Sequence, residues 1–229
     1  MTAPLLCISS MATRTVLADL TADFQSQTGT ELRLEAVGGV DAARRVQAGE
    51  AFDLVVLASD ALAKLVGSGQ VLATSQVDLV HSGVAVAVPA GAYRPDIGTE
   101  AALRAAVLSA AHIGYSTGPS GTQLLKLFAR WGLLETLRDK LVQAPTGVPV
   151  AALLARGEVS LGFQQLSELM HQQGIQVLGG LPEPVQINTT FSAACCAASA
   201  RPQAVQALLD FLRSPAADAA KRRHGMTPA

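Results

Sequence analysis

Short apolar runs alternate with amphipathic stretches along most of this chain, and this alternation constrains the fold more than any other feature. The apolar run at residues 5–8 precedes a stretch, Thr13–Gln27, whose apolar residues recur at helical spacing. The next apolar runs, Leu32–Val37 and Asp53–Leu57, are separated by the helical stretch Asp41–Ala48. Apolar strands separated by helices are typical of parallel βαβ units with helices on both faces. We therefore expect an α/β protein with doubly wound sheets.

The rest of the chain continues the pattern and predicts a second lobe. The expected elements are helix Ala61–Gly67, extended stretches Val77–Val80 and Val84–Val88, helix Glu100–Ala110, strand Ile113–Tyr115, helices Gln123–Arg130, Leu133–Leu141 and Val150–Ala155, strands Ser160–Phe163, Gln176–Leu178 and Thr189–Ala198, and helices Gln203–Arg213 and Pro215–Arg223. The two closing helices need a sheet to cover, so the chain should cross into the second lobe near Ser82-Gly83 and return near Asn188. This predicts lobe one at residues 1–83 plus 189–229 and lobe two at 84–188.

Composition narrows the class of partner. The chain has 229 residues, of which 49% are hydrophobic, enough for one large core or two modest ones. A net charge of −1 gives no reason to expect nucleic acid, so the partner should be a small solute. Three cysteines cannot all pair, and the four histidines show no metal-ligand spacing. We expect no disulfide scaffold, no metal and no cofactor.

The N-terminal residues lack the pattern of a signal peptide, because no basic residue precedes Arg14 and the apolar run is short. No later run is long and apolar enough for membrane insertion. As the chain stands, a cytoplasmic location is expected; a periplasmic location would follow if a leader had been removed.

Ligands of open parallel sheets bind beyond the carboxyl ends of the strands. That rule selects four loops, which are rich in hydroxyls, glycines or amides: Ser9–Arg14, Gly38–Asp41, Ser116–Thr122 and Gln164-Gln165. Such loops suit an anion held in a cleft between two lobes that close by a hinge.

The loop Ser116–Thr122 carries the strongest single signal, because it leads from a short strand directly into a helix. Helix N-termini present unpaired N–H groups and partial positive charge, which favour a carboxylate or an oxyanion. The loop lacks the lysine of a Walker motif and the spacing of a dinucleotide fingerprint. Taken alone, it could equally be a turn with a serine N-cap.

The motifs together carry a family resemblance over nearly the whole chain. They are Ser9–Arg14, Gly38-Gly39, Ala43–Gly49, Phe52–Val56, Gly118-Pro119-Ser120-Gly121, Leu161–Gln165, Phe211–Pro215 and His224–Pro228. In order and spacing they resemble the molybdate-binding-protein-like branch of type II periplasmic solute-binding proteins, a group that includes aconitate isomerases. The resemblance implies a two-lobed fold with the ligand in the cleft, a monomer, and an ABC transporter permease as partner.

The resemblance also locates the expected ligand site. Molybdate binders use hydroxyls on the first two loops and a tyrosine near the second hinge, and the matching positions hold Ala12, Gly39 and Gln165. Arg14 adds a planar fork suited to a carboxylate, although it could equally face solvent. We therefore expect a di- or tricarboxylate rather than molybdate. The expected ligand-binding residues are Ser10, Ala12, Arg14, Gly39, Thr117, Ser120, Gly121, Thr122, Gln164 and Gln165.

Two functions remain open at this stage. The protein is either a solute-binding module for an ABC transporter or an allylic isomerase of the aconitate isomerase type. Isomerisation needs a general base, and Asp41, Tyr115 and His81 are the candidates in reach of the loops, with none singled out. Asp41 is more simply explained as a helix N-cap, and Tyr115 as a buried strand aromatic.

Overall fold

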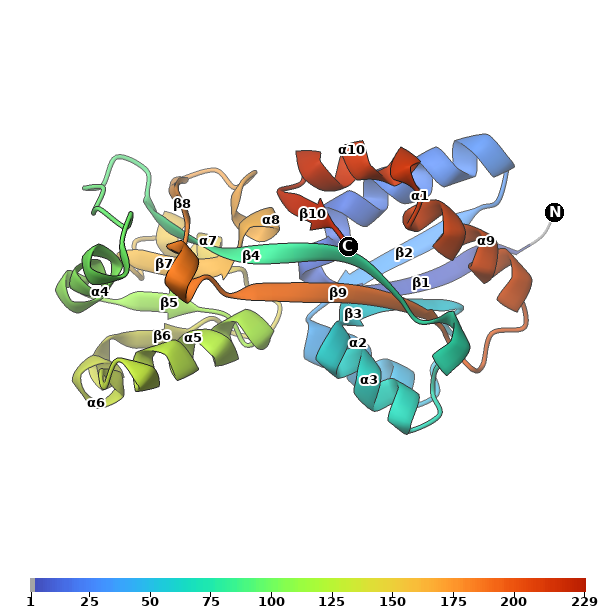
Figure 1. Cartoon of the computed structure of the whole chain (residues 1–229), viewed down its shortest axis with the longest axis horizontal. Coiled ribbons are helices and arrows are strands. Elements are labelled where there is room, and N and C mark those ends of the chain that lie inside the picture. Colours follow the sequence, from blue (N-terminus) through green and yellow to red (C-terminus); the bar gives the residue numbers. More distant parts are fainter. Residues whose placement is uncertain (1–2) are drawn as a thin grey trace. The chain divides into compact units, whose positions relative to one another are not determined.

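The computed structural model describes residues 3–229, which form two compact units (Figure 1). Unit 1 contains the chain up to Ser82 and from Thr190 onward, and unit 2 contains Gly83–Thr189. The chain passes between the units twice, within strands β4 (Val77–Pro89) and β9 (Asn188–Cys195). Met1 and Thr2, which belong to the stretch in which the sequence shows no signal-peptide pattern, lie outside the described residues.

The sheet of unit 1 is built around β1 (Leu5–Ser10). Strands β2 (Leu32–Val37) and β3 (Leu54–Ala58) flank β1 and run parallel to it, while β9 pairs antiparallel with β3. The short β10 (Met226–Pro228) pairs antiparallel with β4. Because β1, β2 and β3 run the same way, their carboxyl ends lie at one edge of this sheet.

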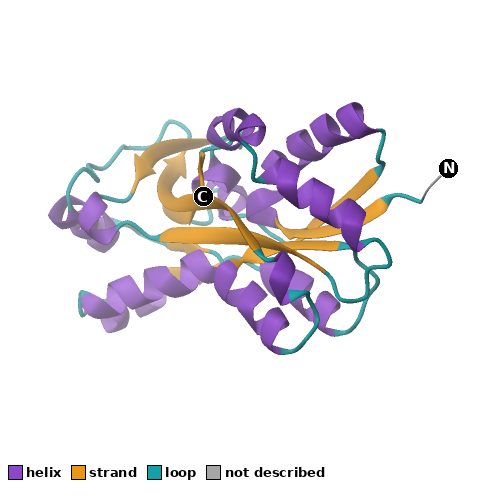
Figure 2. Cartoon of the chain, turned by 45° about the vertical axis from the view of Figure 1, so that its right-hand side comes forward, coloured by secondary structure: helices purple, strands orange, loops and turns teal. Residues whose placement is uncertain are grey.

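Helices cover both faces of this sheet, as the apolar strands require (Figure 2). One face packs against α1 (Arg14–Thr28), α9 (Pro202–Leu212) and α10 (Pro215–Arg223), and the other against α2 (Gly39–Gln47) and α3 (Ser59–Gly67). Alternate residues of β3 therefore enter different cores: Val56 lies in the first and Val55 in the second. Each fully buried aliphatic side chain contributes about 2 kcal/mol of transfer free energy.

Unit 2 repeats the plan around β5 (Ile113–Tyr115). Strands β6 (Leu141–Gln143) and β7 (Leu161–Gln165) run parallel to β5, and β4 pairs antiparallel with both β7 and β8 (Ile175–Gly180). One core lies under α4 (Glu100–Ser109), α5 (Pro119–Arg130) and α6 (Leu134–Leu137), and the other under α7 (Val150–Ala155) and α8 (Leu166–Leu169). The two-unit α/β fold is thus confirmed, although the sheets are mixed: β1, β2 and β3 run parallel, as do β5, β6 and β7, while β4, β8, β9 and β10 form antiparallel pairs.

Three local expectations were wrong. The helix expected over Leu133–Leu141 is an α-helix only at Leu134–Leu137; Arg138–Lys140 form a 3-10 turn, and Leu141 begins β6. Helix α5 begins at Pro119 instead of Gln123, because proline suits the first helical turn, where its missing N–H is not needed. Asp41 is not an N-cap: α2 begins at Gly39, and the Asp41 carboxylate instead accepts a hydrogen bond from Arg44 at 3.2 Å.

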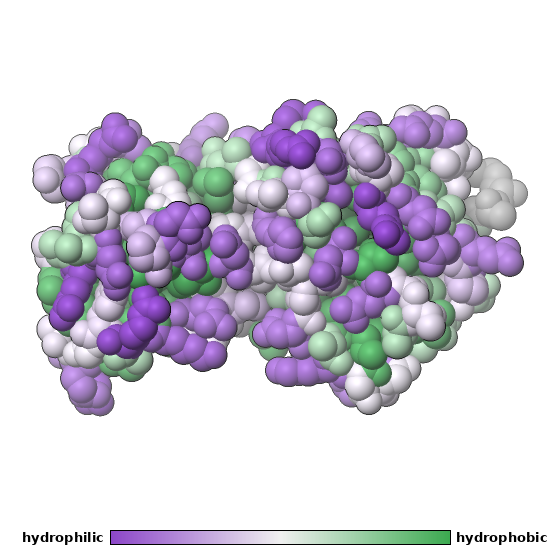
Figure 3. Space-filling model, viewed as in Figure 1, coloured by the Kyte–Doolittle hydropathy of each residue, from purple (hydrophilic) through white to green (hydrophobic). Residues whose placement is uncertain are grey.

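Few large apolar side chains reach the surface. Those exposed are Val40, Leu72, Tyr93, Leu108 and Leu134, and Figure 3 shows hydrophilic residues spread over the visible face of both units. Among the described residues, no helix combines the length and the apolar character needed to span a bilayer.

Candidate functional site

The carboxyl ends of β1 and β2 bring Ser10 and Gly39 together in unit 1. The two strands are in parallel register, with Ser10 opposite Val37, and α2 starts two residues after Val37. A Cβ atom on Gly39 would lie only 3.6 Å from the Ser10 Cβ. No side chain caps the N-terminus of α2. Its first backbone N–H groups are therefore available to an anion at this edge.

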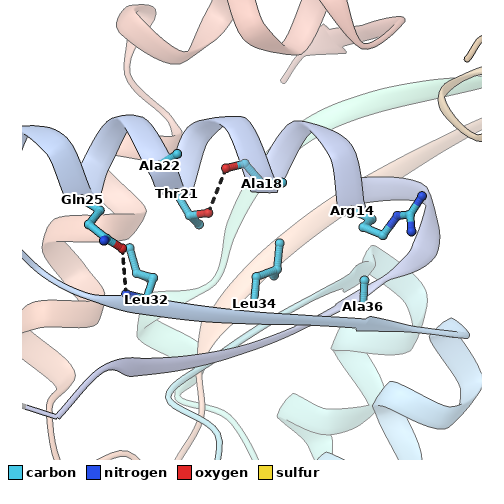
Figure 4. A pocket seen from close by; sticks show the side chains of 8 residues that line it. All are labelled: Arg14, Ala18, Thr21, Ala22, Gln25, Leu32, Leu34 and Ala36. Atoms are coloured by element: carbon cyan, nitrogen blue, oxygen red, sulfur yellow. Dashed lines mark hydrogen bonds between the residues drawn. The ribbon is translucent and has the colours of Figure 1, made fainter.

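Ala12 and Arg14 follow Ser10 but have different environments. The Ala12 methyl is buried in the core beneath α1, so any contact with a ligand would involve its backbone. Arg14 is exposed and forms no ion pair with a described residue. It lines an open groove of about 400 Å³ between α1 and β2. Figure 4 shows Arg14 beside Ala36, near the carboxyl end of β2, while the other end of the groove is closed by a hydrogen bond from the Leu32 N–H to Gln25.

In unit 2, the loop after β5 folds tightly against the start of α5. The Ser116 and Ser120 hydroxyls are 2.9 Å apart, and a Cβ on Gly121 would lie 1.9 Å from the Ser116 carbonyl oxygen. Glycine is required by this close approach. The α5 N-terminus has no side-chain cap, and the N–H groups of Ser120 and Gly121 have no acceptor among the described residues. The sequence therefore builds a helix N-terminus with free donors.

The remaining residues expected in this loop lie at its rim. Thr117 and Thr122 are both exposed, and the Thr122 hydroxyl makes only a long 3.5 Å hydrogen bond to the Gly118 carbonyl. Their hydroxyls are therefore accessible beside the α5 N-terminus.

The two glutamines at the end of β7 point to opposite faces of the sheet, as adjacent strand residues must. The Gln164 amide accepts a hydrogen bond from the Val150 N–H and donates one to Glu168, both at 2.8 Å, so it caps α7. The Gln165 amide is 2% exposed and donates to the Thr189 hydroxyl at 2.8 Å, while its oxygen has no partner among the described residues. Both amide atoms of Gln164 thus have a partner, whereas the Gln165 oxygen is a free acceptor, which suits a donor group of a ligand and not a carboxylate oxygen.

A polar cluster in unit 1 was missed by the sequence analysis. The Asp78 carboxylate accepts a 2.5 Å hydrogen bond from Ser192, whose oxygen is 2.5 Å from the Ser59 hydroxyl. Ser59 also lies 3.1 Å from the Thr190 carbonyl, and the Thr190 hydroxyl lies 2.9 Å from His81 Nδ1. Ser59 directly follows β3, so the rule about carboxyl ends would have found it had the third parallel strand been included.

No group of three or more histidine, cysteine, aspartate or glutamate side chains among residues 3–229 is arranged to hold a metal ion. The donors at both sheet edges are hydroxyls, amides, backbone N–H groups and one guanidinium. Such donors recognise an anion directly.

Comparison with known proteins identifies the family of this chain. Residues 5–227 match the family described as bacterial extracellular solute-binding protein. This chain belongs to that family. An aconitate isomerase from Pseudomonas sp. is 37% identical over 240 residues, covering 98% of this chain and 91% of the relative. The molybdate-binding protein ModA of Azotobacter vinelandii is 29% identical over 115 residues, which cover 48% of this chain and 44% of that protein.

Solved structures place the fold in the same group. The periplasmic molybdate-binding protein of Azotobacter vinelandii has a TM-score of 0.82 at 19% identity, covering 97% of this chain and 98% of that structure. The sulfate-binding protein SubI of Mycobacterium tuberculosis has a TM-score of 0.83 at 16% identity, covering 100% and 88%. This chain therefore has the type II periplasmic-binding-protein fold.

Proposed function

We propose that the protein binds a small di- or tricarboxylate as a solute-binding module. The observation that carries the proposal is the pair of uncapped helix N-termini, α2 in unit 1 and α5 in unit 2, each beside serine hydroxyls. Each of these N-termini, taken by itself, presents unpaired N–H donors and partial positive charge, which suit a carboxylate group.

Carboxylates are favoured over a tetrahedral oxyanion by the side chains present. Ala12 and Gly39 supply no side-chain hydroxyl at the positions that match the first two loops of the molybdate binders. At the position that matches their tyrosine, this chain has the amide of Gln165. The planar guanidinium group of Arg14 can donate two parallel hydrogen bonds to the two oxygens of a carboxylate. The relative with 37% identity is named for aconitate, which is a tricarboxylate.

Thermal unfolding with a ligand panel tests this proposal. At 100 times the dissociation constant, a bound ligand stabilises the folded state by about 2.7 kcal/mol, which for a chain of this size raises Tm by roughly 5–10 °C. We expect such shifts with cis-aconitate, trans-aconitate or citrate and none with molybdate or sulfate. A shift with molybdate alone would refute the carboxylate assignment.

A second candidate function is an allylic isomerase that moves the double bond of an unsaturated tricarboxylate. The specific observation in its favour is the 37% identity to aconitate isomerase over almost the entire chain. Incubation with cis- or trans-aconitate in deuterated water, followed by NMR, distinguishes the two functions. Interconversion with deuterium uptake supports the isomerase, whereas binding without either leaves the solute-binding module.

A role in transport implies a particular protein partner and a particular cellular location. As a transporter component, the protein would work outside the cytoplasm, as the family description implies, and deliver its ligand to an ABC transporter permease as a monomer. Cell fractionation with an antibody against the protein tests the location. Recovery in the cytoplasm alone would favour the isomerase.

A further inference from the structure

His81 is an exposed imidazole whose orientation is fixed on one side. It lies in β4 opposite Thr227 of β10, and its Nδ1 is 2.9 Å from the Thr190 hydroxyl. Its Nε2 atom has no hydrogen-bond partner among the described residues. An imidazole that is held through one nitrogen and open at the other can exchange a proton with a molecule that reaches it.

The position of His81 in unit 1 is set by β3 and β9. Ala58, the last residue of β3, pairs with Phe191, and Ser59 lies 3.1 Å from the Thr190 carbonyl. Thr190, and His81 with it, therefore lies at the carboxyl end of β3. Ser10 ends β1 at the same edge, because Ser9 is in register with Val56. His81 thus shares the edge at which open α/β sheets bind their ligands.

A hydrogen-bond chain with the buried Ser192 at its centre holds the Thr190 backbone in place. Ser192 is fully buried, and its hydroxyl lies between Ser59 and the Asp78 carboxylate, at 2.5 Å from each. The chain connects the start of α3 with β9 and β4, the strand of His81. In the other histidine of unit 1, His224, the Nε2 atom forms a 2.8 Å hydrogen bond with the Asp19 carboxylate on α1.

We propose that His81 is the proton carrier of the isomerisation, an inference that rests on the second candidate function. In the first half of the reaction, Nε2 takes a proton from the CH₂ carbon next to the double bond of the tricarboxylate. The electron pair of that C–H bond becomes part of the new double bond, and the old double bond opens toward its far carbon. In the second half, the imidazolium returns its proton to that far carbon. One proton is removed and one is added, so no oxidant or co-reactant is needed.

Substitution of His81 tests this role directly. His81→Asn keeps an amide that can bond to Thr190 but removes Nε2, and His81→Ala removes the ring. Because a general acid-base group contributes about 10²–10⁴-fold, both variants should lose isomerisation and deuterium uptake by that factor. Both should retain the Tm shift with trans-aconitate. Added imidazole should restore part of the activity of His81→Ala, an effect that a purely structural role of His81 would not produce.

The controls separate the failure of this inference from the failure of the function. His224→Asn, which changes the other histidine of unit 1, should keep wild-type activity at 25 °C. Wild-type activity in His81→Ala would overturn the role of His81 and leave the isomerase function standing. Absence of both interconversion and deuterium uptake with the wild-type protein would overturn both.

Discussion

Gly121→Ala is the substitution for which the structure gives the most definite expectation. A Cβ at this position would lie 1.9 Å from the Ser116 carbonyl oxygen and 2.9 Å from its carbonyl carbon. Both are backbone atoms, so no side-chain rotation relieves the clash, and the loop after β5 must move by roughly 1 Å or more. Overpacking of this kind costs about 1–3 kcal/mol. Alanine's higher helix propensity offsets at most about 1 kcal/mol of that cost.

Urea unfolding followed by tryptophan fluorescence measures the loss of unfolding free energy in unit 2. The single tryptophan, Trp131, packs against Phe128 in the core of unit 2, so its fluorescence reports the unit that contains Gly121. We expect Gly121→Ala to lower the unfolding free energy of unit 2 by about 2 kcal/mol. It should also weaken trans-aconitate binding, because the Ser116–Ser120 contact and the α5 N-terminus shift together.

Gly118→Ala is the matched control, because a Cβ there would meet only the Ser116 hydroxyl, at 3.8 Å. Because Gly118 is the N-cap of α5, where alanine is disfavoured, this variant should lower the unfolding free energy by less than about 1 kcal/mol and leave binding close to that of the wild type. Equal losses in the two variants, or none in Gly121→Ala, would refute the reasoning from close approach.

Three further predictions concern other parts of the chain. Arg14→Ala should weaken tricarboxylate binding about ten- to hundredfold in a calorimetric titration, since hydrogen bonds to charged groups contribute about 1.5–3 kcal/mol; unchanged affinity would make Arg14 a solvent-facing residue. Burial acts to raise the pKa of Asp53, but hydrogen bonds from Ser199, the Leu6 N–H and Arg201 outweigh it and hold the pKa below its ordinary value of 3.8. Asp53→Asn should therefore lose roughly 3 kcal/mol at pH 7, and its deficit relative to the wild type should shrink as pH falls below 3.8; a deficit independent of pH would contradict this. Burial raises the pKa of the Cys7 and Cys196 thiols to about 12, so both should resist a thiol reagent at pH 8 until the protein is unfolded, whereas rapid labelling of the native protein would show that they are accessible.

The sequence predicted the arrangement of long elements better than the ends and the short elements. Apolar runs such as Leu54–Ala58 and helical spacing such as that of Arg14–Thr28 are repeated signals, and the structure contains both elements within a residue or two of expectation. Strands of three residues, such as β6 and β10, are too short to show a period. They form because neighbouring strands offer backbone partners, which a local pattern does not show.

The candidate site was predictable where local geometry determines it. The close approach of Gly121 to Ser116 and the nearness of Gly39 to Ser10 occur in loops at the carboxyl ends of parallel strands. The different roles of Gln164 and Gln165 depend on contacts with Val150 and Thr189, which lie 14 and 24 residues away. The Asp78–Ser192 hydrogen bond spans 114 residues, so only the folded chain brings its two side chains together.

Isothermal titration calorimetry of the wild-type protein with trans-aconitate and with molybdate tests the central claim most directly. We predict saturable binding of one trans-aconitate per chain and no heat of binding with molybdate under the same conditions. Saturable binding of one molybdate per chain, with no binding of trans-aconitate or citrate, would contradict the assignment of a carboxylate ligand.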